Sequence, residues 1–344
     1  MQDFSEILKK QQKNEIERKE KYGKIRPIIH VNHRESKFVA VGSRVGFSKK
    51  WKTFTDFLMD YIKDILGRSW GDAELKKPPE ERHEILKWYE RVCNFQLKQT
   101  KGQDGIYSVV PNGVFSAYLS LAYDLYILEH HKAIQEDIIR RLKLSDQFHG
   151  ARYELFVTAT CIRAGFDIKF ENEKDRSGKH PEFIAIHKDT GQKISVEAKS
   201  KKRDGILGRF NLGITDDKVR LRVGKCINQA SAKKSSYPLV VFIDVNLSPN
   251  MALKIMKMPS PNKISETVDR IKKTSDGKDI FNLLVFTNHP HHYGRDDEPD
   301  PKKNILSFFS EKPQTIINHP KTLWDLHQAT LQYGNIPSKF PEKS

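Results

Sequence analysis

The stretch HPEFIAIHKDTGQKISVEAKSKKR, residues 180–203, decides the fold that we expect for this chain. Two runs within it, residues 181–187 and 194–200, read as strands, and the letters DTGQ between them are typical of a turn. Along the second run, Glu197 and Lys199 fall on one face, whereas Val196 and Ala198 fall on the other. Two charged side chains opposite an apolar face require a chemical reason.

The turn between the two strands predicts how they pair. A loop of two or four residues centred between Thr190 and Gly191 places Glu182 opposite Lys199. We therefore expect Glu182, Glu197 and Lys199 to point to the same side of the sheet, close to one another. A slip of one residue would move Glu182 to the far face, so the expectation depends on the register.

Two carboxylates at such a short separation repel each other unless a cation lies between them. Mg²⁺ prefers carboxylate and phosphate oxygens, lowers the pKa of a bound water and stabilises charge on a phosphate. Lys199 could orient or activate that water, or neutralise developing negative charge. The alternative is a surface Glu–Lys pair on an edge strand, which would contribute little. The spacing of the residues leaves both interpretations open.

The letters PE at 181–182 and EAK at 197–199, joined by a short hairpin, resemble the PD-(D/E)XK signature of restriction-endonuclease-like nucleases. The helix expected at 150–165, GARYELFVTATCIRAG, resembles the first core helix of that superfamily. The resemblance covers about residues 148–290, including the order of helices and strands. The family usually has Asp after Pro, and this chain has Glu, a departure that could mark a weakened or inactive site.

The resemblance implies a set of catalytic residues, namely Glu154, Glu182, Glu197, Lys199 and Gln229. Within that set, Glu182 and Glu197 would hold the metal with Glu154 completing the site, and Gln229 would support it from the next helix. The backbone carbonyl of Ala198 would be a further metal ligand. The implied cofactor is Mg²⁺, with Mn²⁺ as a substitute.

The fold class that we expect is α/β, with a restriction-endonuclease-like mixed central sheet flanked by helices and a mostly helical N-terminal region. Residues 1–145 should hold a charged helix, a short β-hairpin and a helical bundle that includes one long helix over about 114–142. Residues 146–300 should form the nuclease core, and residues 301–344 a short helical tail.

Composition favours a nucleic-acid partner. The chain has 60 Lys and Arg against 44 Asp and Glu, a formal net charge of +16, which favours a polyanion. A solvated basic surface is the alternative. Basic residues after the expected catalytic strand are candidates for phosphate contacts, namely Lys201, Lys202, Arg203, Arg209, Lys218, Arg220, Arg222 and Lys225.

The cysteines indicate a reducing compartment. Cys93, Cys161 and Cys226 are far apart and have no C-x-x-C spacing, so neither a disulfide framework nor a zinc knuckle is expected. No stretch approaches about 18 uninterrupted apolar residues, so we expect no membrane span. Cytoplasmic localisation follows as an expectation.

The sequence thus predicts a Mg²⁺-dependent endonuclease that hydrolyses phosphodiester bonds, in DNA more than in RNA. The resemblance to standalone nucleases suggests restriction or antiviral defence by association alone. Two alternatives stay open: a catalytically degenerate nuclease fold that binds nucleic acid, and an assembly or sensor subunit of a defence complex. As an assembly or sensor subunit, the chain would use its N-terminal helical region to form a homo-oligomer or to bind a partner protein.

Overall fold

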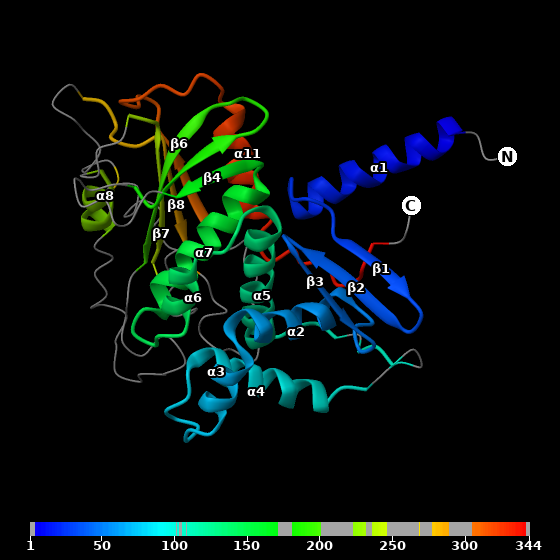
Figure 1. Ribbon diagram of the computed structural model, residues 1–344. Coiled ribbons are helices and arrows are strands. Elements are labelled where there is room, and N and C mark those ends of the chain that lie inside the picture. Colours follow the sequence, from blue (N-terminus) through cyan, green and yellow to red (C-terminus); the bar gives the residue numbers. More distant parts are fainter. Residues whose placement is uncertain are drawn as a thin grey trace.

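The structure is a computed structural model that describes residues 4–100, 102, 105–107, 109–170, 181–200, 223–231, 236–245, 268, 277–288 and 305–341. The chain begins with helices and a small sheet and continues into a larger sheet between helices (Figure 1). This order confirms the expected α/β class with a mostly helical N-terminal region.

Seven helices precede the large sheet in the described part of the chain: α1 (Phe4–Tyr22), α2 (Phe54–Leu66), α3 (Arg68–Leu75), α4 (Glu84–Leu97), α5 (Gly113–His131), α6 (Glu136–Leu142) and α7 (Phe148–Arg163). The expectation of one long helix over 114–142 is wrong, because α5 ends at His131. Lys132 has an extended backbone there, and its N–H still donates to the carbonyl of Leu128. The break lets α6 turn and pack against α7.

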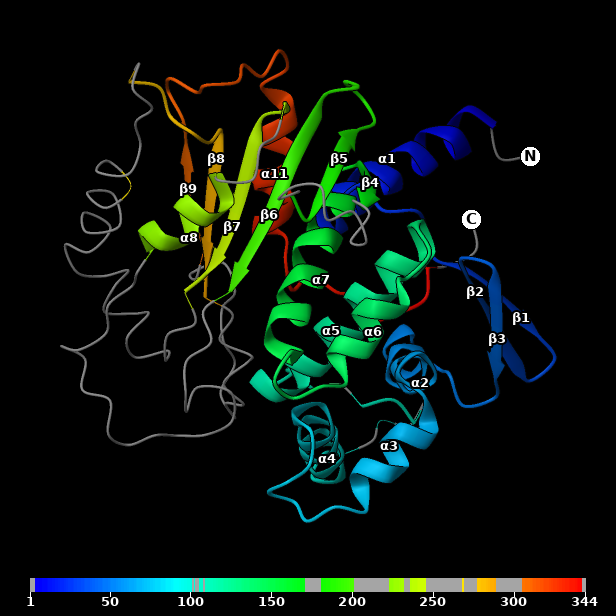
Figure 2. The same ribbon diagram turned by 60° about the vertical axis from the view of Figure 1, so that its left-hand side comes forward.

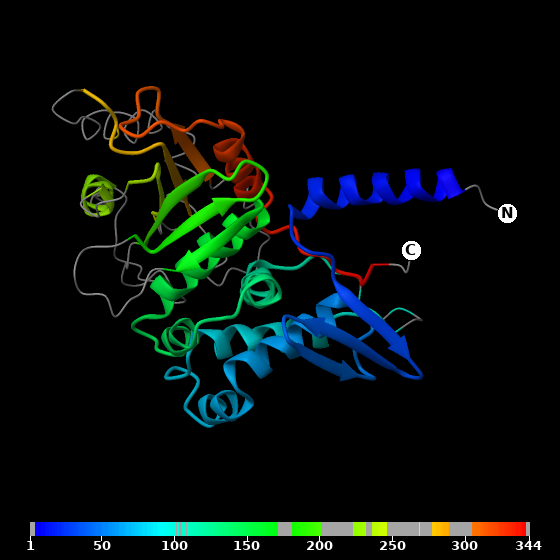
Figure 3. The ribbon, with the colours of Figure 1, turned by 45° about the horizontal axis from the view of Figure 1, so that its top comes forward.

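The expected β-hairpin of the N-terminal region is a three-stranded antiparallel sheet. Its strands are β1 (Ile29–His33), β2 (Ser36–Val41) and β3 (Arg44–Ser48), in that order. Val39 and Val41 are buried on one face and belong to the main hydrophobic core. Helix α1 projects away from the rest of the molecule (Figure 3).

The large sheet has six strands in the order β4 (Phe166–Phe170), β5 (Phe183–His187), β6 (Lys193–Ser200), β7 (Leu239–Asp244), β8 (Leu283–Thr287) and β9 (Ile305–Phe309). The β6–β7 and β7–β8 pairs are parallel and the other pairs are antiparallel, so the predicted mixed sheet is confirmed. We expected a short helical tail, but the tail also contains a strand, since β9 pairs with β8 at the edge of the sheet.

Helices cover both faces of this sheet. Helices α7 and α11 (Lys321–Leu331) pack on one face, whereas α8 (Val223–Ser231) packs on the other (Figures 1 and 2). The strand β7 is buried on both faces, which explains the continuous apolar sequence LVVFI before Asp244. One hydrophobic cluster includes both the N-terminal helices and this sheet, so it runs across residue 145. The three-segment division of the chain stays a prediction about folding units.

The hairpin register differs from the expected one by two residues. Ile184 pairs with Ser195 and Ile186 pairs with Lys193, so the loop spans residues 188–191. Thr190 is consistent with the shift, because its hydroxyl is 3.0 Å from His187 Nδ1 and accepts from the N–H of Gln192, which fixes a four-residue turn one position earlier than expected. A shift of two residues keeps every side chain on its predicted face.

None of the helices in the described residues is long and apolar enough to cross a membrane.

Candidate active site

Strand β6 positions the two charged residues that the sequence singled out. Val196 and Ala198 face α7 and the main core, whereas Glu197 pairs in register with Val241 of β7, which belongs to the cluster beneath α8. Glu197 and Lys199 therefore lie on the α8 face of the sheet. The predicted sharing of one face is confirmed.

Glu182 lies directly before β5 and joins the same face. The hairpin register, continued by one position, puts it beside Glu197 rather than opposite Lys199. Its carboxylate oxygen Oε1 accepts a hydrogen bond from Lys199 Nζ at 3.1 Å. The same ammonium is 2.7 Å from Oε2 of Glu197. Two carboxylates and one amine thus converge on one point.

Burial makes this cluster electrostatically strong. Glu197 is fully buried, and the side chains of Lys199 and Glu182 are 19% and 28% exposed. Burial of the Lys199 ammonium lowers its pKa, but attraction to Glu197 and Glu182 outweighs that effect and raises the pKa above its usual value. Lys199 is therefore a cation in this arrangement, suited to neutralise negative charge rather than to remove a proton.

The donor set fits a divalent cation. Carboxylate oxygens are the ligands that Mg²⁺ prefers, and those of Glu182 and Glu197 already face one positively charged atom. The cluster lies where β6 ends, at Ser200, and where β5 begins. Mg²⁺ bound there would polarise a phosphate and lower the pKa of a water molecule.

Glu154 is not brought into this cluster. It lies on α7, on the opposite face of the sheet, and its carboxylate forms a two-pronged ion pair with the Arg141 guanidinium of α6. The described residues contain no group of three metal-binding side chains that includes Glu154, Glu182 and Glu197. The contact with Arg141 has no sequence signal, because the two residues lie on different helices, 13 residues apart.

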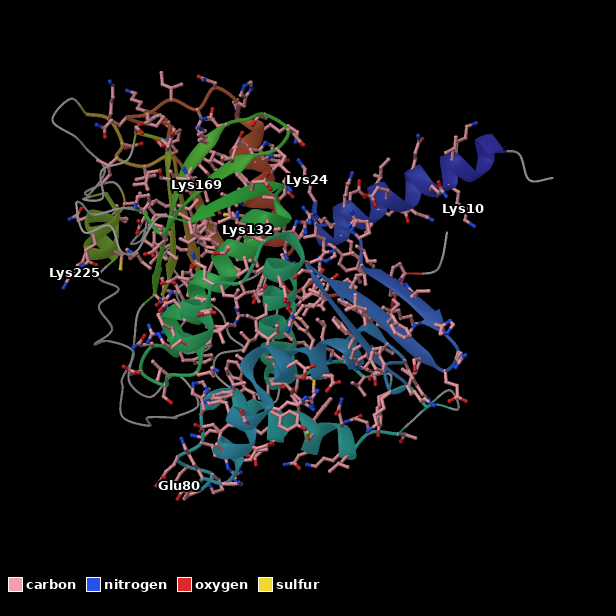
Figure 4. The ribbon with its side chains drawn as sticks, viewed as in Figure 1. Lys10, Lys24, Glu80, Lys132, Lys169 and Lys225 are labelled. Atoms are coloured by element: carbon pink, nitrogen blue, oxygen red, sulfur yellow. The ribbon has the colours of Figure 1, made fainter. Side chains whose placement is uncertain are left out.

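Gln229 is likewise outside the cluster. It is exposed on α8, and the residues of that helix that face the sheet are Cys226, Ile227 and Ala230. Lys225 is also exposed on α8 (Figure 4), on the face of the sheet that carries Glu197. The other predicted phosphate-binding residues, from Lys201 to Arg222, lie outside the described residues.

A second acidic cluster lies at the tip of the β5–β6 hairpin. His187, Asp189 and Asp325 bring ligand atoms within 4.8 Å of one another. Lys24, which follows α1 (Figure 4), neutralises it, since its ammonium is 2.6 Å from Asp189 and 2.8 Å from Asp325. Lys321 forms ion pairs with the same two carboxylates. These contacts tie α1 and α11 to the hairpin, so we assign the cluster to stability.

Sequence reasoning also missed a buried polar pair at the carboxyl end of β7. His149 Nε2 is 3.0 Å from Asp244 Oδ2, and both side chains are almost fully buried. Asp244 points to the α7 face, away from Lys199. The spacing of 95 residues between the partners gave no signal in the sequence.

The chain was compared with known proteins at three levels. No protein-family model, no curated protein and no solved structure matches it. The resemblance to PD-(D/E)XK nucleases therefore stays a prediction, carried by this chain's own residues.

Proposed function

We propose that the chain is a Mg²⁺-dependent nuclease that hydrolyses phosphodiester bonds in nucleic acid. The observation that carries the proposal is the convergence of Glu182, Glu197 and Lys199 on one point of one sheet face. The strand order supports it, because a helix, three antiparallel strands, a helix and a parallel strand follow one another as expected for a restriction-endonuclease-like core.

Each residue of the cluster has a role in this proposal. Glu182 and Glu197 would hold the cation, with the Ala198 carbonyl as a third ligand on the grounds of resemblance alone. Lys199 would neutralise charge that develops on the phosphate, a role that suits its raised pKa. The basic surplus of the chain would attract the polyanionic substrate.

A cleavage assay with Mg²⁺ and with EDTA tests the proposal. Single-stranded and duplex DNA and RNA serve as substrates, and the variants are Glu197→Gln, Lys199→Ala and Lys193→Ala. Loss of one charge-stabilising group should lower the rate about 100-fold or more. Lys193, an exposed lysine at the other end of β6, is the matched control and should leave the rate unchanged.

A binding measurement without turnover separates the metal from the chemistry. Mg²⁺ or Mn²⁺ should raise the unfolding temperature of the wild type, because a ligand of the folded state stabilises it. Glu182→Gln and Glu197→Gln should abolish this shift. Full cleavage by both Glu197→Gln and Lys199→Ala would assign the activity to another site.

A second candidate function is nucleic-acid binding by a degenerate core. Two observations favour it: Glu154 is held by Arg141, and Glu182 stands where the family usually has Asp. The candidate predicts salt-sensitive binding of nucleic acid with no cleavage under Mg²⁺ or Mn²⁺. Cleavage that depends on Lys199 would reject it.

A further inference from the structure

The three-stranded sheet of the N-terminal region has an apolar outer face. Cross-strand partners share a face, and the register forms one row from Ile29, Ala40 and Val45 and a second row from Val31, Phe38 and Phe47. Four of these six side chains are strongly exposed: Ile29 by 57%, Val31 by 45%, Val45 by 66% and Phe47 by 68%. We call these six residues the outer face.

The fold does not need the outer face for its core. The opposite face of the same sheet carries Val39 and Val41, which are buried in the main hydrophobic core. An antiparallel sheet packed on one side normally presents polar residues to water on the other. A contiguous exposed apolar patch is instead typical of a surface that binds something.

Aromatic rings indicate what the outer face binds. The rings of Phe38 and Phe47 lie 5.3 Å apart and nearly parallel, at 23°. His33 adds a third exposed ring, 6.4 Å from that of Phe38. Aromatic side chains on an open sheet are a platform on which unpaired bases stack, typically two or three bases per sheet.

The charge around the outer face selects the partner. Residues 29–50, which form this sheet and its turns, contain five lysines and arginines and a single acidic residue, Glu35, which pairs with Lys49. Arg34, Lys49 and Lys50 are exposed at the end of the sheet that carries Phe47. Two copies of this chain joined face to face would bring like charges together, whereas a phosphate backbone would be attracted.

We propose that the outer face binds unpaired nucleic acid, with bases stacked on Phe38 and Phe47 and phosphates along Arg34, Lys49 and Lys50. The site is separate from Glu182, Glu197 and Lys199 and does not rest on the proposed cleavage. A duplex cannot use it, because paired bases keep their faces covered.

Fluorescence anisotropy of the full chain in EDTA tests the proposal with labelled oligothymidylate, oligouridylate and a blunt DNA duplex. Phe47→Ala should weaken binding of at least one single-stranded probe about 10-fold and leave the duplex affinity unchanged. Phe47→Trp should retain single-strand binding, whereas Phe47→Leu should lose it. The matched control is Trp324→Ala, an exposed aromatic residue on α11 that should change neither affinity.

Three outcomes would overturn the proposal. The first is single-strand affinity that is the same in Phe47→Ala and wild type. The second is full affinity in Phe47→Leu, which would mean that apolar area rather than a ring matters. The third is a self-association, seen by analytical ultracentrifugation, that Phe47→Ala disrupts while oligonucleotide binding persists. The measurement is made in EDTA and without turnover, so failure of the cleavage proposal would not affect this result.

Discussion

Replacing Lys199 by methionine tests the electrostatics of the candidate site through stability rather than activity. The fully buried carboxylate of Glu197 has the ammonium of Lys199 at 2.7 Å. Methionine keeps the length of the side chain but removes the charge, so Glu197 would be buried without that cation. Breaking a buried pair from one side costs about 3–5 kcal/mol, and we expect a loss of that size in EDTA.

Replacing Glu197 instead of Lys199 should lower the free energy of unfolding by a smaller amount. Glu197→Met leaves Lys199 with Glu182 as its partner and with partial access to water, so we expect a loss of about 1 kcal/mol. The double variant with methionine at both positions should fall within about 1 kcal/mol of the wild type, because neither buried charge is left without its partner. The asymmetry between the two single variants is the signature of this geometry.

Urea unfolding followed by circular dichroism, in EDTA and with Mg²⁺, measures all three variants. Lys193→Met on the same strand is the control and should change stability by less than about 0.5 kcal/mol. A cost for Lys199→Met that does not exceed the cost for Glu197→Met would refute the reasoning. A double variant that lost as much stability as the sum of the two single variants would also refute the reasoning.

Three further predictions concern the framework around the site. Burial lowers the pKa of His83 to about 4, so stability should fall by about 2 kcal/mol as the pH drops from 7 to 5, and urea titrations of His83→Gln should show a smaller drop. Arg152→Met should cost about 3–5 kcal/mol in urea unfolding, because Asp124 is fully buried 2.8 Å from the guanidinium; a loss below 1 kcal/mol would contradict this. Gly42→Ala should cost about 1–3 kcal/mol in the same assay, since its φ is +56° and a Cβ would lie 2.7 Å from the carbonyl oxygen of Glu129; an unchanged midpoint would contradict it.

The alternation of short runs predicted the part of the fold that holds the site. In β6, apolar residues at every second position face α7, and this pattern alone assigned Glu197 and Lys199 to the other face. The register error of two residues left the predicted faces correct, because side chains return to the same face of a strand every two residues. What the pattern could not give is the side-chain bonding of Thr190, which fixes the position of the loop.

Elements fixed by distant contacts were not predictable from local patterns. The five apolar or small residues of β9 read equally well as a piece of helix, and only the neighbouring β8 makes them a strand. The break between α5 and α6 has neither Pro nor Gly to signal it, and beyond the break α6 packs on α7. Glu154 was misplaced with respect to the cluster because α7 packs on the face of the sheet opposite Glu197.

Stability alone is a weak reason for the charged cluster on β6. Well-packed apolar side chains at such positions are often as stabilising as a buried ion pair, or more so. The neighbouring strand places Val241 and Ile243 beside Glu197 and Lys199, so apolar residues would suit this face. Charge kept where apolar side chains would fit agrees with the function proposed above, which requires a cation between carboxylates. The double variant with methionine at positions 197 and 199 discriminates between these explanations. If it is stable but neither cleaves nucleic acid nor binds Mg²⁺, the charged cluster serves function and not folding.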